Sequence, residues 1–491
     1  MLALKGRKVL ILEREDRLGG CLMSGEVTLP GFTHDVMATT WVLFMTGPAG
    51  AVLGPHLARH GFVYAHSPHP TAVVRPDGSA LVLTMDRARN VAALNAVAAG
   101  DGEQHALDVG GIARDAPFLF ALLGGNLWSW GTLRLLLGQV RRRGLRGLVG
   151  WFGRALAPAR GWLEGSYASP LVQALYAPWV LHCGLTPENA YSAKMGQVVA
   201  FALEAAGAPV VKGGAGQAVA AFAALIREQG GELRSGAEVS RINVQEGRVT
   251  GVTLAGGEVV AARSVLASVT PSQLAVLLAA VTLPEAPPFR HGRGNFQLHY
   301  ALDRVPEWQS PGLEEVALIH LSDGIDAVSK SANEAERGML PEVPTICVGQ
   351  PSRLDPSRCP PGKAVLWLQV PDAPRMIKGD AAGQIAARDW NAAREAFADR
   401  IEAILARHIK DFAAIKLARR AYSPADLAAL NVNLVGGDPY GGMCSIDQFF
   451  VWRPNANANL VKGLAHIGAS THPGPGLGGG SGYLAAKGLG A

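Results

Sequence analysis

Two glycine-rich segments carry the residues best suited to bind a ligand through the backbone. The pair at 19–20 follows the apolar run 8–12, which ends at Glu13. Six further glycines stand within residues 474–482, directly ahead of an expected helix over 483–487. Glycine loses more conformational freedom on folding than other residues, so such clusters indicate backbone that closely approaches something else. An acid at a strand end can bind ribose hydroxyls, and a helix N-terminus favours negative charge. Together these segments predict a nucleotide-cofactor site.

Helices and strands in alternation are expected to position these segments. A helix over 217–228 has its apolar residues on one face, and the glycines at 230–231 end it. The alternating runs 238–242 and 248–254 predict a β-hairpin. A buried strand is expected over 264–268. This order is typical of an α/β scaffold.

The position of Glu13 predicts that the chain begins inside a βαβ unit. In a dinucleotide-binding unit, the glycine-rich turn lies about 20 residues before the acid that ends the second strand. Twenty residues before Glu13 falls ahead of Met1. The first strand and the G-x-G-x-x-G turn are therefore expected to be missing. Either the native start lies upstream, which we favour, or the protein binds its cofactor poorly.

Several segments resemble one enzyme family. Residues 13–20 (EREDRLGG) and 29–40 (LPGFTHDVMATT) resemble the second strand and following loop of the phytoene desaturase-like branch of the FAD-dependent amine oxidase superfamily. Segments 212–271 and 463–487 resemble its later FAD-binding segments. Segment 176–192 is similar to the subgroup of the pyridine nucleotide-disulfide oxidoreductase domain-containing protein 2. The absent glycine-rich turn departs from the family pattern, which puts tight FAD binding in doubt.

The resemblance implies an FAD-dependent oxidoreductase that takes a hydride from a C–H bond of an apolar, isoprenoid-like substrate. It implies an α/β fold, with a discontinuous FAD/NAD(P)-binding Rossmann-like domain and an inserted α+β substrate domain of antiparallel sheet plus helices. The positions expected to bind FAD are Glu13, Arg14, Gly19, Gly20, Val239, Gly468, Ser470, Gly478 and Gly479.

The domain division follows from these segments. The FAD-binding domain is expected to comprise residues 1–70, 210–285 and 440–491, and the substrate domain residues 71–209 and 286–439. The first insertion is expected to be mainly helical. The second contains long alternating runs, which predict an antiparallel sheet over the flavin.

Two histidines are weak catalytic candidates. His472, within the terminal glycine-rich segment, either donates to the flavin or substrate or packs the loop. His182 lies in an apolar setting, where a hydrogen-bonded core histidine is about twice as probable as a catalytic one. The pair His34-Asp35 is expected to cap and orient the first glycine loop. No spacing typical of a metal site or of a hydrolytic triad stands out, so no metal is expected.

Composition limits the class of protein, its compartment and its partners. With 48% hydrophobic and 17% charged residues, the chain can bury a large core. Its five scattered cysteines favour a reducing compartment over a disulfide scaffold. Seven arginines and no acid stand within residues 127–163, among four tryptophans and clusters of leucine. This basic stretch is either a membrane-surface element or a helical cap with solvated arginines. The many apolar side chains of this stretch argue against a nucleic-acid partner.

These observations predict a cytoplasmic protein, peripheral on the inner membrane, whose partner is an apolar small molecule. An alternative is a flavin-poor, membrane-associated interaction protein that retains the fold, and the missing glycine-rich turn is the observation that favours it.

Overall fold

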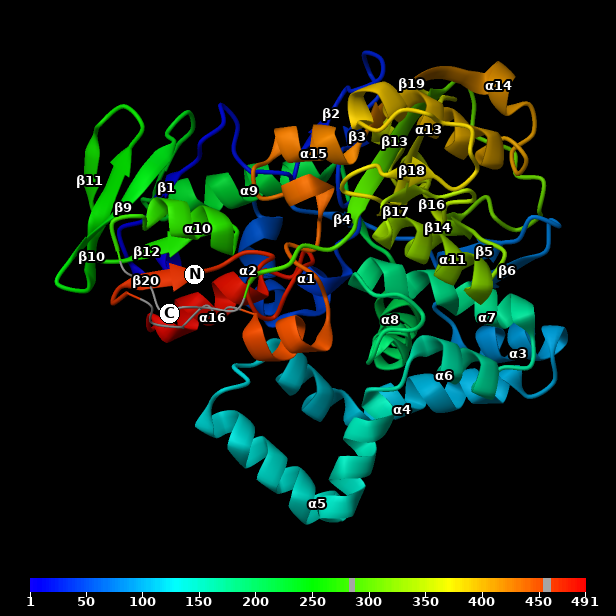
Figure 1. Cartoon of the computed structure of the whole chain (residues 1–491), viewed down its shortest axis with the longest axis horizontal. Helices are drawn as coiled ribbons and strands as arrows, with labels where there is room; N and C mark the ends of the chain where they lie inside the picture. Colours follow the sequence, from blue (N-terminus) through cyan, green and yellow to red (C-terminus); the bar gives the residue numbers. More distant parts are fainter. Residues whose placement is uncertain (282–287, 454–460) are drawn as a thin grey trace.

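The chain is described by a computed structural model that covers residues 1–281, 288–453 and 461–491. Figure 1 shows the strands near both termini on one side, a large sheet on the other side and a helical part below them. The predicted domain boundary at 285 lies outside the described residues.

Two parallel strand pairs form the part that carries both termini. β1 (Leu10–Leu12) pairs with β8 (Glu232–Arg234), and β12 (Val265–Ala267) pairs with β20 (Leu464–His466). The apolar run 8–12 predicts a fully buried strand, but β1 covers only its last three residues and Ile11 is exposed. β1 has a strand partner on one side only.

Three helices pack beside these strands, around an aromatic cluster. They are α2 (Pro48–Ala58), α9 (Ala215–Glu228) and α16 (Gly480–Gly488). Trp41, Phe44 and Phe62 meet edge to face in their shared core. The predicted helix over 217–228 is confirmed as α9, and the terminal helix begins three residues before its predicted start.

The predicted hairpin is part of a three-stranded antiparallel sheet. Its strands are β9 (Val239–Gln245), β10 (Arg248–Leu254) and β11 (Val259–Ala261), in the order β11-β10-β9.

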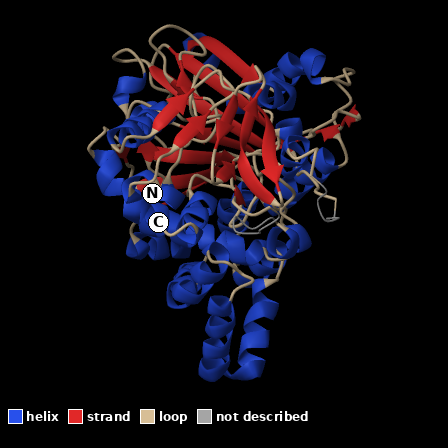
Figure 2. Cartoon of the chain, turned by 90° about the vertical axis from the view of Figure 1, so that its left-hand side faces the viewer, coloured by secondary structure: helices blue, strands red, loops and turns tan. Residues whose placement is uncertain are grey.

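A seven-stranded sheet forms the centre of the other part (Figures 1 and 2). In sheet order its strands are β19 (Lys416–Tyr422), β13 (Gly294–Leu302), β17 (Ala364–Ala373), β16 (Ile346–Gly349), β14 (Val316–Leu321), β5 (His69–Val74) and β6 (Ala80–Leu83). All neighbours are antiparallel except β14 and β5, which are parallel. The predicted antiparallel sheet is thus confirmed, with one parallel pair.

The two faces of this sheet are both covered but differ in chemistry. One face is apolar and packs on α13 (Trp390–Leu405), where Phe296 meets Phe397 at 5.1 Å between ring centroids. The opposite face carries polar side chains on β13, and every residue of that strand is buried.

The first insertion is largely helical and projects from the body (Figure 2). α5 (Trp130–Ala155) bends at Gly144, whose φ of 71° and ψ of 161° are not helical. Its two arms pack with α4 (Asp101–Gly124) around Phe118, Leu148 and Trp151. The other helices of this part are α3 (Arg87–Val97), α6 (Ala159–Ser166), α7 (Pro170–Tyr176), η2 (Ala177–Cys183) and α8 (Ser192–Ala206).

Short elements complete the described fold. The helices are η1 (Ala3–Lys5), α1 (Val42–Thr46), α10 (Pro271–Leu277), α11 (Ile325–Glu336), α12 (Pro351–Leu354), η3 (Pro356–Arg358), α14 (Phe412–Ile415), α15 (Pro424–Leu430), η4 (Val435–Gly437) and η5 (Asp447–Trp452). The strands are β2 (Ser24–Gly25), β3 (His34–Asp35), β4 (Tyr64–Ala65), β7 (Val210–Val211), β15 (Met339–Leu340) and β18 (Gly379–Asp380).

Candidate functional site

The loop after β1 begins with the predicted acid, Glu13. Its backbone N–H continues the pairing with β8 by donating to the Arg234 carbonyl at 2.8 Å. Its carboxylate Oε1 accepts from the Glu15 N–H at 3.0 Å. Arg14 is half exposed and forms a 3.1 Å ion pair with Glu15. Glu13 therefore orders its own loop, and the Arg14 side chain lies at the surface.

The two glycines of this loop have positive φ, of 107° at Gly19 and 59° at Gly20. A Cβ on Gly19 would lie 2.7 Å from the Val219 side chain of α9 and 2.8 Å from the Leu22 carbonyl. Gly19 thus lets the loop pack tightly against α9, while the Gly20 carbonyl accepts from the Arg17 guanidinium at 2.7 Å.

The segment after β20 presents open backbone. Gly468 has a φ of 107°, and a Cβ there would meet no atom closer than 3.8 Å. Its N–H donates to the Ser481 hydroxyl of α16 at 2.9 Å, which ties the strand end to the helix N-terminus. The buried Ser470 follows. Carboxyl ends of parallel strands are where α/β folds bind ligands.

Gly478 and Gly479 lead into α16 and rest on the α1–α2 corner. A Cβ on Gly478 would lie 3.5 Å from Leu43, and one on Gly479 would lie 3.3 Å from Ala49. The first amides of α16 follow directly. Open backbone at Gly468 beside a helix N-terminus fits a group that needs close approach and stabilisation of negative charge.

Val239 and His472 are the other predicted positions. Val239 begins β9 and is partly buried. His472 bonds through Nε2 to the Gly125 carbonyl, and burial lowers its pKa. This contact ties the terminal loop to the end of α4, which is the loop-packing alternative expected for His472.

A buried ionic group joins the two parts of the molecule. Arg358 is fully buried and lies 3.1 Å from both Asp35 and Asp355. The pair His34-Asp35 is expected from the sequence to cap the first glycine loop, but Asp35 accepts from the Ala215 N–H at 2.7 Å and so binds the first residue of α9. Burial raises the pKa of Asp355, but hydrogen bonds from Ser357 and Gly213, together with Arg358, hold it below its ordinary value.

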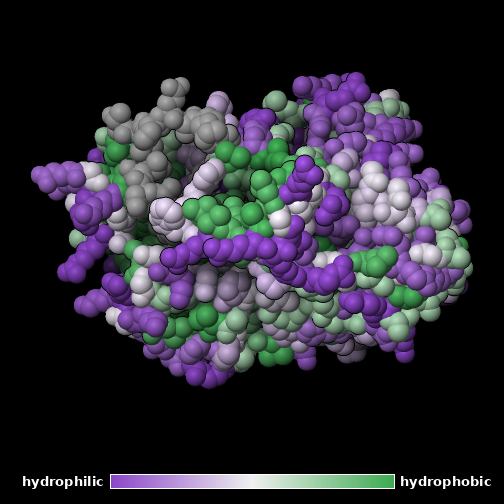
Figure 3. Space-filling view, turned by 90° about the horizontal axis from the view of Figure 1, so that it is seen from below, coloured by the Kyte–Doolittle hydropathy of each residue, from purple (hydrophilic) through white to green (hydrophobic). Residues whose placement is uncertain are grey.

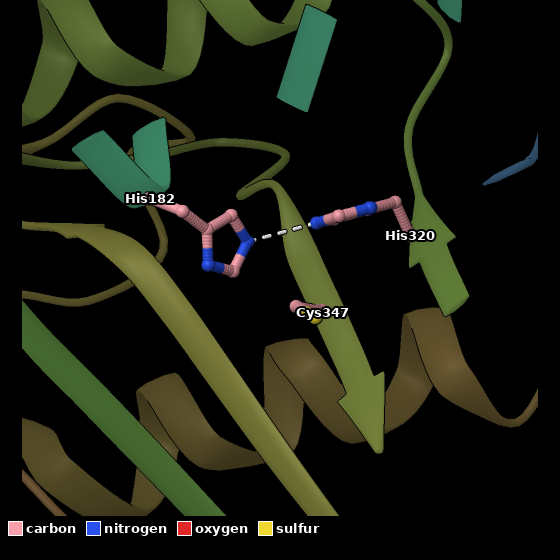
Figure 4. Close-up of side chains that lie close together, drawn as sticks. All are labelled: His182, His320 and Cys347. Atoms are coloured by element: carbon pink, nitrogen blue, oxygen red, sulfur yellow. Dashed lines mark hydrogen bonds between the residues drawn. The ribbon is translucent and has the colours of Figure 1, made fainter. Parts of the chain in front are cut away.

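Figure 4 shows His182, His320 and Cys347 beside one another, on η2, β14 and β16. The two Nε2 atoms are 2.9 Å apart, so one ring donates and the other accepts. Burial lowers the pKa of His182 to about 4 and that of His320 well below its ordinary value. Burial raises the pKa of the Cys347 thiol. All three side chains are therefore neutral near pH 7, and His182 belongs to a hydrogen-bonded pair.

Sequence reasoning missed His320, Cys347 and Arg358. His320 and Cys347 stand in the otherwise apolar runs VALIHL and ICVG, without alternation of polar and apolar residues. Such runs are typical of buried strands and do not mark a functional residue. Arg358 stands in a loop without any spacing that indicates a role.

Comparison with known proteins shows which family the chain resembles. The family model described as flavin containing amine oxidoreductase matches residues 165–430, and an NAD(P)-binding Rossmann-like domain matches residues 1–47. The chain is 30% identical over 305 residues to "Pyridine nucleotide-disulfide oxidoreductase domain-containing protein 2" of Mus musculus, covering 56% of this chain and 50% of the relative. It is 31% identical over 275 residues to "zeta-carotene-forming phytoene desaturase" of Myxococcus xanthus, covering 54% and 49%.

Among solved structures, an oxidoreductase from Methanosarcina mazei superposes with a TM-score of 0.63 at 14% identity, over 99% of this chain and 95% of the other. At that identity the likeness shows the fold alone. The chain spans about half the length of the curated relatives it matches.

Proposed function

Because the chain belongs to the flavin-containing amine oxidoreductase family, we propose that it is an FAD-dependent oxidoreductase that takes a hydride from a C–H bond of an apolar, isoprenoid-like substrate. FAD, which the family match supports, supplies the hydride acceptor. The observation that carries the proposal is the open backbone of Gly468 beside the N-terminus of α16. The substrate class rests on the phytoene desaturases among the relatives.

The residues of this chain would act by positioning the substrate. Trp367 projects from the polar sheet face and donates its Nε1–H to the Met37 carbonyl at 2.8 Å, which fixes the segment after β3 beneath the sheet. His182 and His320 are neutral, so this face offers no ionised base at these positions. Orienting a C–H bond and excluding water are the contributions that such a face supports.

Replacing Gly468 with alanine is expected to weaken FAD binding about tenfold or more. The new methyl group would enter the open space, while the surrounding protein atoms stay at least 3.8 Å away. FAD titration of the deflavinated protein measures the effect. Gly362→Ala is the control, because Gly362 also has a positive φ of 79° and no atom within 4 Å, but lies in the loop before β17.

Equal loss of FAD affinity in both variants would attribute the effect to backbone strain. A purified wild-type protein that stays colourless with added FAD would contradict the enzyme proposal and favour the flavin-poor interaction protein. Anaerobic bleaching of the flavin by an isoprenoid substrate would support the proposal.

We also propose that the arm formed by α5 docks on an anionic membrane surface. Trp128 and Trp130 are 73% and 80% exposed, and Leu145 and Val149 are exposed on the second arm. The two tryptophans are among the most exposed large apolar side chains of the described residues. Seen from below, hydrophilic and hydrophobic residues lie side by side on the molecule (Figure 3).

The charge of this arm supports the same partner. Arg143 pairs with Asp115, but no carboxylate among the described residues lies within ion-pair distance of Arg141, Arg142 or Arg146. Tryptophan and arginine on an amphipathic helix fit the headgroup layer. No helix in the described ranges is both long and apolar enough to cross a bilayer.

Removing three of the positive charges of this arm should weaken vesicle binding strongly. Each arginine near an anionic surface contributes about 1 kcal/mol, so replacing Arg141, Arg142 and Arg146 with glutamine should weaken binding on the order of 100-fold. Sedimentation with phosphatidylglycerol vesicles at low salt measures this. A matched triple variant at the exposed Arg241, Arg263 and Arg407 should bind as wild type does. Absence of wild-type binding would remove the membrane proposal.

A further inference from the structure

A row of polar side chains crosses the seven-stranded sheet on the face opposite α13. Strand register places Tyr422 beside Gln297, Gln297 beside Gln369, Gln369 beside Cys347 and Cys347 beside His320. These five residues, here called the polar row, come from five adjacent strands. Side chains at paired positions share a face of a sheet, so the row is continuous across it.

Several polar atoms along this face lack partners. Gln297 Oε1 and His320 Nδ1 are buried without a hydrogen bond. On β13 the flanking residues of the same face, Asn295 and His299, also hold unpartnered atoms. Burying polar atoms without partners is unfavourable, so a face built this way indicates a ligand that completes the bonds.

The row is also accessible at its centre. Gln369 is the only residue of β17 that is not fully buried, although the strand lies between β13 and β16. His182, which bonds to the end of the row at His320, is likewise partly buried. Gln369, at the centre of the row, is therefore not completely enclosed by the packed side chains.

We propose that the polar row binds a neutral oxygen group, a hydroxyl or a carbonyl, on an otherwise apolar substrate. This rests on the proposed function and narrows its substrate class from apolar isoprenoid-like molecules in general to those that bear a hydroxyl or carbonyl oxygen. Glutamine amides both donate and accept, so they can bind either group. No carboxylate stands in the row, so it offers an ammonium group no ionic partner.

The test compares geraniol with 2,6-dimethylocta-2,6-diene, the hydrocarbon with the same skeleton, and with geranylamine. Dissociation constants are read from perturbation of the flavin absorption spectrum of the holoenzyme, without requiring turnover. We expect geraniol to bind at least tenfold more tightly than the hydrocarbon, because each hydrogen bond contributes about threefold to tenfold. Gln297→Met/Gln369→Met should reduce this preference to less than threefold, since methionine keeps the length of glutamine without its donors and acceptors.

Thr71→Val is the matched control. Thr71 is buried on the same face, outside the polar row, and its hydroxyl is also unpartnered. It should keep the wild-type preference for geraniol. Gln369→Met alone, at a partly exposed position, serves if the double variant does not fold.

Four results would overturn the proposal: equal affinity for geraniol and the hydrocarbon, a preference that survives in the glutamine variants, tighter binding of geranylamine, or no spectral change with any probe. Failure of the proposed function is distinguishable, because it appears as a geraniol preference without anaerobic bleaching of the flavin.

Discussion

Replacing Arg358 with methionine is expected to destabilise the protein by about 3–5 kcal/mol and to release FAD. The guanidinium is fully buried and lies within ion-pair distance of two carboxylates, Asp35 and Asp355. Removing one partner of a buried ion pair leaves an uncompensated charge, which is far more costly than losing an exposed pair. Here two negative charges would remain.

The expected loss of FAD follows from what Asp35 holds. Its carboxylate accepts from the Ser24 hydroxyl at 2.6 Å and from the Ala215 N–H at the start of α9. α9 in turn supports the loop at Gly19 through Val219. If Asp35 moves when Arg358 is removed, the glycine loop loses its support.

Urea unfolding and FAD titration measure both effects. Arg353→Met is the control, because Arg353 lies five residues away and pairs with Glu315 at the surface. Exposed pairs contribute at most about 1 kcal/mol. A loss of stability in Arg358→Met no larger than that in Arg353→Met would contradict the ionic explanation.

The parts of the fold predicted from the sequence are those with local signals. The helix over 217–228 and the hairpin that follows it depend on periodicity and on glycine stops, and both are present as α9 and β9–β10. The terminal helix begins at Gly480, earlier than predicted. Glycine has a poor intrinsic helix propensity, which favours a later start, but packing of α16 on α2 overrides this propensity.

The polar row could not be predicted in the same way. Alternation along 294–302 indicates one apolar and one polar face, and such a polar face normally meets water. In the structure every residue of β13 is buried, and His299 packs between the rings of His34 and Tyr422. Only long-range packing decides this outcome. The same applies to Arg358, whose two acids stand 323 and 3 residues away along the chain.

The second large effect on stability is expected from replacing Glu204, whose hydrogen bonds join three helices of the projecting part. Its carboxylate is 5% exposed and accepts from His105 at 2.7 Å, Asn90 at 2.9 Å and Arg87 at 2.7 Å. Burial raises the pKa of Glu204, but hydrogen bonds from these three side chains outweigh it and lower the pKa to about 2. The folded state therefore favours the ionised form.

A folded pKa of about 2 against an ordinary value of 4.5 corresponds to about 3 kcal/mol of stability. Because the pKa is lowered on folding, this contribution is present above pH 4.5 and is lost as the pH falls toward 2. Glu204→Gln cannot ionise and turns an amide N–H toward donors, so its deficit of about 3 kcal/mol at pH 7 should diminish near pH 3. Urea unfolding at both pH values measures this.

Glu228→Gln isolates the role of burial in this effect. Glu228 also accepts from a histidine, His60, at 2.9 Å, but its side chain is 43% exposed. Water screens an exposed pair and replaces its lost hydrogen bonds, so this variant should change stability little at either pH. Equal destabilisation by the two substitutions would mean that the buried hydrogen bonds of Glu204 contribute no more to stability than an exposed pair. The packing of α4 on α8, which carries the α5 arm, would then depend on apolar contacts alone.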